Sequence, residues 1–444
     1  MIDKDALKRL AEVACDAAIQ GGAEFADVRA SHGRNLRVEL EKNAIKSSDA
    51  KLGGGLSVRA IYRGGVGWSS TDKLTPEAAA EAGMQAAKLS KLAEPDPDFQ
   101  SLPSPPASYP TVEGLADPAL ARMDIKEIVG FGLRNMDDAL LVDPHAIVEG
   151  GFSVGFSADA FVNSLGISLA DNGSHISGSI TAVVRRGDDV GSFYDFDSAR
   201  VLADFVPEGL GVKATEQALK FLGSRKMQTG RMSVILGPLS SRSIFYGVVG
   251  NADAEDIQRG RSFMIGKLGQ KIASDALTLT DDPLIPRGLG SRYHDYEGSP
   301  SKPLVVMRDG VLVSYLYSSY TAAKAGVEPT GHGTRGGGAA ASNIVPKLGA
   351  MTADQIIKDT REGIYINRGG ISPNSANGDV SGSVDFGFKI ENGEMAYPIE
   401  STMVGGNFLD MLQNIDAISS DYREEPGSIM PTLRIQDVLV AGGK

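Results

Sequence analysis

Few side chains in this 444-residue sequence could bind a metal ion or form a redox centre. The sequence has one cysteine, Cys15, and five histidines. The two closest histidines, His145 and His175, are 30 positions apart, so one helix or hairpin cannot bring both to one metal. A single cysteine excludes an intrachain disulfide, a Cys-x-x-Cys redox pair and a zinc ribbon, and it fits a reducing compartment. The residues therefore provide no local metal motif.

His332 is the histidine that we single out for chemistry. It lies between Gly331 and Gly333, and we expect these glycines to leave its imidazole accessible in a loop. Paired with a nearby carboxylate, His332 could serve a hydrolase as general base. The commoner alternative is a loop histidine that only hydrogen-bonds the backbone. No serine is marked by its neighbours as an activated nucleophile, and the acids at 253–256 are typical of a solvated face or a helix cap.

Two glycine runs, Gly53–Gly55 and Gly336–Gly338, could suggest a phosphate-binding loop. Neither shows a strand, the G-x-G-x-x-G spacing and a helix in that order, and neither ends in the Lys-Ser/Thr of a P-loop. We therefore expect mobile loops, or places where another backbone approaches closely, rather than a nucleotide site.

Charge and hydropathy restrict the partners and the compartment that we expect for this protein. The 44 basic and 56 acidic residues give a formal net charge of −12, and no Lys/Arg stripe offsets it, so we expect no nucleic-acid partner. The N-terminus is charged from residue 3 and does not read as a secretory signal. No apolar run is long enough to cross a bilayer. We expect a cytoplasmic protein without a membrane partner.

Helices and strands alternate in the first half of the chain. Helical spacing or capping signals predict helices over 7–18, 75–92, 124–140 and 214–222. Alternating apolar residues predict antiparallel strands over 36–40, 56–62 and 66–68, with a turn at 63–65. Further strands are predicted between 147 and 184, with a turn at Asp171-Asn172-Gly173. Between the two halves of this region, prolines at 95, 97, 103, 105, 106 and 110 indicate an extended connector.

The second half of the chain is predicted to be rich in sheet. Asp309-Gly310 and Asn392-Gly393 each lie between alternating apolar residues, the pattern of a hairpin with a type I′ turn. We predict an α+β architecture, with N-terminal antiparallel strands and packed helices and a C-terminal domain of curved antiparallel β-sheet. The expected divisions are an N-terminal α/β block, a proline-rich connector, a strand-rich central block and a C-terminal β-rich domain, at 1–93, 94–117, 118–229 and 230–444.

A succession of short motifs in the C-terminal half resembles the TldD/PmbA family, named as modulators of DNA gyrase and regarded as two-subunit zinc metalloproteases. No single motif is specific, but their order and spacing together are, and the resemblance covers essentially the whole chain. The motifs are Arg259-Gly260-Arg261-Ser262-Phe263, Gly266-Lys267-Leu268-Gly269, Ala273-Ser274 to Thr280-Asp281-Asp282, Asp309-Gly310-Val311-Leu312, Pro329-Thr330-Gly331-His332-Gly333, Glu391-Asn392-Gly393-Glu394 and Pro431-Thr432-Leu433.

The resemblance also locates a metal site that this chain has lost. In the TldD branch a helix carries His-Glu-x-x-x-His shortly before the Arg-Gly-x-Ser segment, and a cysteine near the C-terminus is a further ligand. Counting back from Arg259 places Phe245 and Gly250 at the two histidine positions and Tyr246 at the glutamate position. These side chains cannot hold zinc or accept a proton from its water. The chain therefore resembles the PmbA branch, also called TldE, with no catalytic residue and no metal of its own.

Membership of that branch would imply a heterodimer in which a TldD-type subunit holds the zinc and this chain shapes a chamber for an extended or unfolded peptide. Gly331, His332 and Gly333 are the candidate peptide-contacting residues. The alternative is a homodimeric peptide-binding or regulatory protein, similar to a gyrase modulator, without protease activity. A standalone hydrolase using His332 is a third possibility.

Overall fold

One antiparallel sheet builds the N-terminal half of the protein in the computed structural model, which describes residues 2–443. Its strand order is β3-β2-β1-β4-β5-β6. The segments before and after the proline-rich connector each contribute three neighbouring strands, so the two blocks share one sheet. The strands are β1 (Phe25–Glu41), β2 (Ala44–Tyr62), β3 (Gly65–Thr71), β4 (Ile147–Asn163), β5 (Ser168–Arg186) and β6 (Asp189–Ala199).

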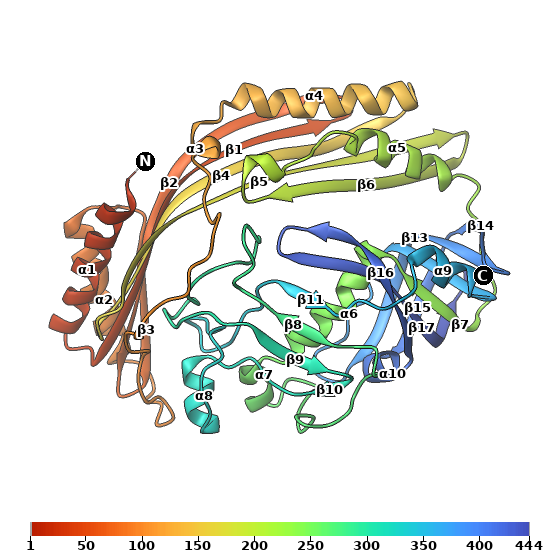
Figure 1. Cartoon of the computed structure of the whole chain (residues 1–444). Coiled ribbons are helices and arrows are strands. Elements are labelled where there is room, and N and C mark those ends of the chain that lie inside the picture. Colours follow the sequence, from red (N-terminus) through yellow and green to blue (C-terminus); the bar gives the residue numbers. More distant parts are fainter. Residues whose placement is uncertain (1, 444) are drawn as a thin grey trace.

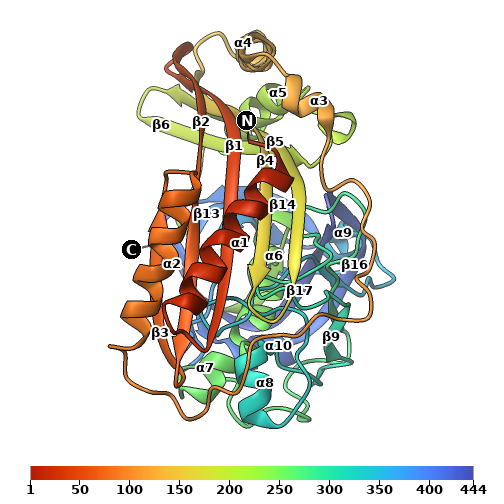
Figure 2. The same cartoon turned by 90° about the vertical axis from the view of Figure 1, so that its left-hand side faces the viewer.

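Helices cover the convex face of this sheet, which curves like an arch (Figure 1). One pair packs at the end nearest the N-terminus and another pair at the far end, and Figure 2 shows the first pair in front of the strands. These helices confirm the four that the sequence predicts. The helices of this half are α1 (Lys4–Gln20), α2 (Pro76–Ser90), α3 (Pro118–Arg122), α4 (Ile125–Val142), α5 (Leu210–Lys220) and the short 3-10 helix η1 (Leu202–Asp204).

Strand alternation separates the two faces of the sheet. Val28 and Ala30 are buried beneath α1 and α2, so their neighbours Asp27 and Arg29 face the concave side.

The predicted turn at 171–173 is wrong. Asp171 pairs with Asp159 inside β5, and the chain turns instead just before β5, where Gly166 has φ 102°. Register with β4 outweighs the local turn preference of Asp-Asn-Gly.

The C-terminal domain contains two further sheets, with orders β10-β9-β8-β11 and β12-β7-β17-β15-β13-β14. In the larger sheet β16 pairs with β17, and β12 also pairs with β13, so five strands form a closed ring. Both predicted hairpins are present, with positive φ at Asp309 and Asn392. The strands are β7 (Gly230–Leu236), β8 (Leu279–Asp281), β9 (Leu304–Arg308), β10 (Val311–Leu312), β11 (Ile344–Pro346), β12 (Glu362–Gly369), β13 (Asp379–Glu391), β14 (Glu394–Ile399), β15 (Thr402–Asn407), β16 (Ile415–Glu425) and β17 (Ser428–Ala441).

Short helices complete this domain around its large apolar core. The pairing of β7 with β12 is parallel, whereas the named strands of the C-terminal domain otherwise pair antiparallel. The predicted α+β class is confirmed. The helices are α6 (Pro238–Asn251), α7 (Ala254–Gln258), α8 (Ser319–Ala325), α9 (Ala353–Lys358) and α10 (Phe408–Gln413).

The C-terminal domain contacts the N-terminal sheet at both ends of the arch (Figure 1). At the far end the Phe386 ring lies 4.6 Å from the Phe193 ring, centroid to centroid. At the near end the Tyr293 hydroxyl donates to Asp171 at 2.5 Å. These contacts join both ends of the arch to the C-terminal domain. Within residues 2–443, no helix combines the length and the apolar character needed to cross a membrane.

Candidate functional site

The three positions of the lost zinc motif lie on α6, which begins at Pro238 directly after Gly237. Phe245 is fully buried in the core of the C-terminal domain. Tyr246 stacks under the guanidinium of Arg242, 4.7 Å from Cζ to the ring centroid, and Gly250 is exposed. Within residues 2–443 no three His, Cys, Asp or Glu side chains are grouped so that they could hold a metal. The residues present do not fit a zinc ion.

His332 is not accessible, contrary to the sequence-based expectation. The side chain is 0% exposed, because residues far away in sequence enclose it. Its Nδ1 lies 2.9 Å from the Thr330 carbonyl, which can only accept, so Nδ1 is the donor. Nε2 lies 3.5 Å from Asp281, and Asp281 already accepts the hydroxyl and the amide of Ser342. A peptide could reach this ring only if the loop moved, and the peptide-binding role of Gly331, His332 and Gly333 stays a prediction.

Replacement of His332 should therefore change stability rather than chemistry. We expect His332→Ala to lower the free energy of unfolding by about 1–3 kcal/mol, because it leaves a cavity and an unpaired carbonyl. The matched control is His145→Ala at an exposed position, which should stay within about 0.5 kcal/mol. Urea denaturation measures both. A variant that kept full stability but lost all activity in any peptidase assay would instead support a catalytic His332.

The concave face of the N-terminal sheet is polar and rich in hydroxyl groups. Ser153 lies opposite Ser177 across β4 and β5, and their Oγ atoms are 2.9 Å apart. Arg37 on β1 pairs with Ser153 in the same row. Ser179 and Thr181 continue this face along β5. Short polar side chains and exposed backbone suit contacts with a peptide main chain better than selection of apolar side chains.

A cavity of about 280 Å³ lies at the near end of this concave face, and we call it the interdomain cavity. The sheet contributes side chains of β1, β4 and β5, and the C-terminal domain contributes the loop 289–296. Tyr293 joins the two sides through its hydrogen bond to Asp171. The cavity thus has charged and aromatic groups within reach of a ligand on the concave face.

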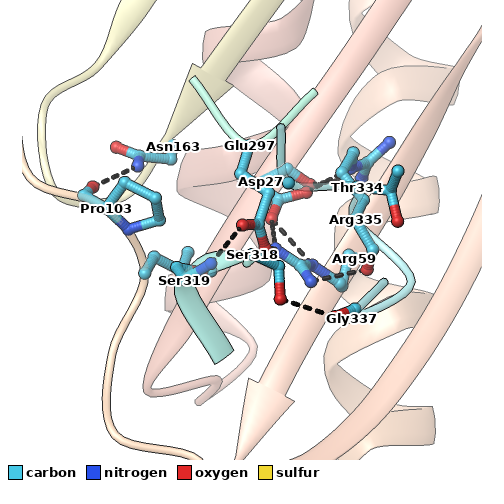
Figure 3. Close-up of polar contacts among 12 residues, drawn as sticks. Asp27, Arg59, Pro103, Asn163, Glu297, Ser318, Ser319, Thr334, Arg335 and Gly337 are labelled. Carbon is cyan, nitrogen blue, oxygen red and sulfur yellow. Dashed lines mark hydrogen bonds and ion pairs between the residues drawn. The ribbon is translucent and has the colours of Figure 1, made fainter. Parts of the chain in front are cut away.

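A buried ionic cluster beside the cavity holds the loop 331–338 against the sheet (Figure 3). Asp27 accepts hydrogen bonds from Arg59 Nε at 2.8 Å and from Arg335 Nε at 2.5 Å. Arg59 in turn donates to the Arg335 carbonyl at 2.6 Å. The side chains of Asp27, Arg59 and Arg335 are 1%, 7% and 10% exposed. Buried charges of this kind are stable only when they are paired.

Two further carboxyl groups border the ionic cluster. Glu297 lies 3.8 Å from Arg59 and accepts the Ser319 amide at 2.8 Å. Burial raises the pKa of Glu297 to about 7, although Arg59 opposes the shift. Burial also raises the pKa of Asp295, which accepts the amide of Gly333. Both carboxyl groups therefore take up a proton at a higher pH than an ordinary carboxylate does.

The expectation that no serine is marked by its neighbours is wrong at one place, because Gly151-Phe152-Ser153-Val154-Gly155 has the Gly-x-Ser-x-Gly spacing of serine hydrolases. It lies in the middle of β4 and pairs on both sides, with β1 and β5. Ser153 contacts another serine rather than a histidine. An activated serine requires a strand-to-helix elbow and a base, so this match has no catalytic meaning here.

Comparison with known proteins identifies the three parts of the chain. Residues 26–90 match PmbA/TldA metallopeptidase domain 1, residues 118–222 match the central domain, and residues 229–442 match the C-terminal domain. Fold and sequence therefore define the class as three-domain, metallopeptidase-type proteins. The chain belongs to the PmbA/TldD family.

Individual relatives span almost the whole chain. A metalloprotease of Methanothermobacter thermautotrophicus is 28% identical, covering 96% of this chain and 97% of the relative. Metalloprotease PmbA of Escherichia coli is 25% identical, covering 99% and 97%. TldE from Thermococcus kodakarensis has a solved structure with a TM-score of 0.88 at 25% identity, covering 98% and 100%. A structure from Bacteroides thetaiotaomicron, described as a modulator of DNA gyrase, has a TM-score of 0.90 at 27% identity, covering 98% and 99%.

Proposed function

We propose that this chain is the non-catalytic, PmbA/TldE-type subunit of a cytoplasmic zinc metallopeptidase whose zinc is held by a TldD-type partner. The observation that carries the proposal is the replacement of all three zinc-motif positions on α6. Phe245 contributes to the core, Tyr246 stacks on Arg242, and Gly250 has no side chain. The similarity to relatives named PmbA and TldE supports the same reading.

The substrate that we propose is an extended or unfolded peptide. The polar concave face offers hydroxyl groups and short side chains along several strands, and β6 is the terminal strand of its sheet. Main-chain hydrogen bonds to such a surface bind a peptide with little dependence on its sequence. A folded protein would not present its backbone in this way, so the chamber favours disordered or already trimmed chains.

Metal analysis of the purified proteins tests the assignment of the zinc. We expect this chain alone to contain no stoichiometric zinc, and a complex co-purified with a TldD-type subunit to contain it. The control is the TldD-type subunit purified by itself. One tightly bound zinc per copy of the isolated chain would contradict the proposal. If no complex forms and the isolated chain is a homodimer that binds peptides, the regulatory alternative suggested by the name modulator of DNA gyrase replaces it.

A further inference from the structure

Arg200 borders the interdomain cavity without a counter-ion. It takes part in no ion pair within residues 2–443. Its two terminal nitrogens donate to the carbonyls of Leu115 and Leu289, at 3.2 and 2.6 Å. Its Nε is buried and has no hydrogen-bond partner. Burial lowers its pKa, as expected for a cation without a nearby carboxylate.

Arg292 lines the same cavity and also takes part in no ion pair within residues 2–443. Its terminal nitrogens donate only to main-chain carbonyls, among them Ala340 at 2.9 Å, and its Nε is also buried without a partner. Its guanidinium lies 5.4 Å from the centre of the Tyr296 ring, and Arg29 lies at the same distance from that ring. Three guanidinium groups therefore gather at the cavity, two of them uncompensated.

The carboxylates of the cavity already have partners of their own. Asp171 accepts the Tyr293 hydroxyl at 2.5 Å. Asp159 accepts the Ser157 hydroxyl at 2.6 Å and lies 3.7 Å from Arg29. Asp295 accepts backbone amides, from Glu297, Ser299 and Gly333. The three arginines and three aspartates of the lining balance in formal charge. None of these acids forms an ion pair with Arg200 or Arg292, however, so two guanidinium groups of the cavity have no ionic partner among the described residues.

We propose that the interdomain cavity binds a carboxylate group of a peptide, from an acidic side chain or from the C-terminus. Guanidinium groups are the preferred partners of carboxylates. A peptide fits better than a free inorganic anion because Phe161 and Tyr293 give the cavity apolar walls, and because the polar concave face leads away from it. This inference rests on the proposed function as far as the peptide is concerned, but it concerns binding by this chain alone.

Binding of designed peptides to the isolated chain tests the proposal directly. The probes are unstructured peptides of glycine, serine and alanine that carry an uncharged dansyl label at the N-terminus: one amidated with a single Glu, one amidated with Gln in its place, and one with Gln and a free C-terminal carboxylate. Fluorescence anisotropy should show that at least one acidic probe binds about tenfold more tightly than the neutral probe. Comparison of the two acidic probes identifies the source of the carboxylate.

Several results would overturn the proposal. Equal affinities for the three probes, or no measurable binding of either acidic probe, would exclude carboxylate recognition. Displacement of the acidic probe by inorganic phosphate at lower concentrations than by acetate would identify a phosphate site instead. None of these results bears on complex formation with a TldD-type subunit, so the two proposals can fail separately.

Variants show whether the two arginines cause the preference. Arg200→Gln and Arg292→Gln should each reduce the ratio of acidic to neutral affinity toward one, whereas Arg292→Lys should keep part of it. The matched control is Arg185→Gln on β5, which removes an exposed arginine outside the cavity and should leave the ratio unchanged. Both arginines also donate to loop carbonyls, so a substitution could unfold part of the protein. Partial unfolding lowers the affinities for the acidic and the neutral probe alike, so the ratio of the two affinities is the readout. An unchanged ratio in folded Arg200→Gln and Arg292→Gln variants would overturn the assignment.

Discussion

Asp27→Asn should lower the free energy of unfolding by about 3–5 kcal/mol, the usual cost of removing one partner from a buried ion pair. Asp27 receives Arg59 on one oxygen and Arg335 on the other. The substitution keeps the shape of the side chain but leaves two buried guanidinium groups without their shared negative charge. Urea denaturation followed by circular dichroism measures the change.

Glu41→Gln is the matched control for this prediction, because it removes a carboxylate from the same strand, β1. Glu41 pairs with Lys46 at 3.1 Å, and both side chains are exposed, so the expected loss is about 0–1 kcal/mol. Equal effects of the two substitutions would show that the ionic cluster contributes no more than an exposed pair. A large effect of Asp27→Asn alone would establish that the cluster fastens the loop 331–338 to the sheet.

Stability should fall as the pH rises from about 4.5 to about 7, and Glu297→Gln should remove much of this dependence. Burial raises the pKa of Glu297 from 4.5 to about 7. In this window the folded protein holds a proton that the unfolded chain has lost, so raising the pH favours unfolding. The full cost is present above pH 7 and disappears as the pH falls toward 4.5. A shift of this size corresponds to about 3 kcal/mol.

Glu297→Gln should therefore stabilise the protein by about 3 kcal/mol at pH 8 and have little effect at pH 4.5. Asp295 lies near Glu297, and its own pKa is also raised. The Glu297→Gln variant should therefore still lose some stability as the pH rises, but less than the wild type. The guanidinium of Arg59 lies 3.8 Å from Glu297. Urea denaturation at several pH values measures both profiles. Parallel profiles for the wild type and Glu297→Gln would contradict the assignment.

The parts of the fold that local patterns encode were predictable. Thr75 before Pro76 caps its helix as expected, and the two Xaa-Gly turns set the predicted hairpins. The turn predicted from local residues at Asp171-Asn172-Gly173 is wrong, because strand pairing overrides the turn preference there. A tight turn can be read from neighbouring residues, but the length of a strand depends on its partners.

The candidate site was predictable only in part, because distant residues build most of it. The resemblance located Phe245, Tyr246 and Gly250, which lie within one helix. Arg335 meets Asp27 across 308 positions, and no local pattern signals that contact. His332 looked accessible between its glycines, yet Asp281 and other distant residues enclose it. Alternation of polar residues along β1 and β5 was an available signal of a polar concave face.

The most direct test of the account is a peptidase assay on an equimolar mixture of this chain with a zinc-loaded TldD-type subunit, using an unstructured peptide as substrate. We predict cleavage that a chelator abolishes, with no cleavage by this chain alone. Adding zinc to the isolated chain should not produce activity, because α6 presents Phe245, Tyr246 and Gly250 where ligands and base would be needed. Chelator-sensitive cleavage by the isolated chain, or a mixture no more active than the zinc-loaded partner by itself, would contradict the central claim.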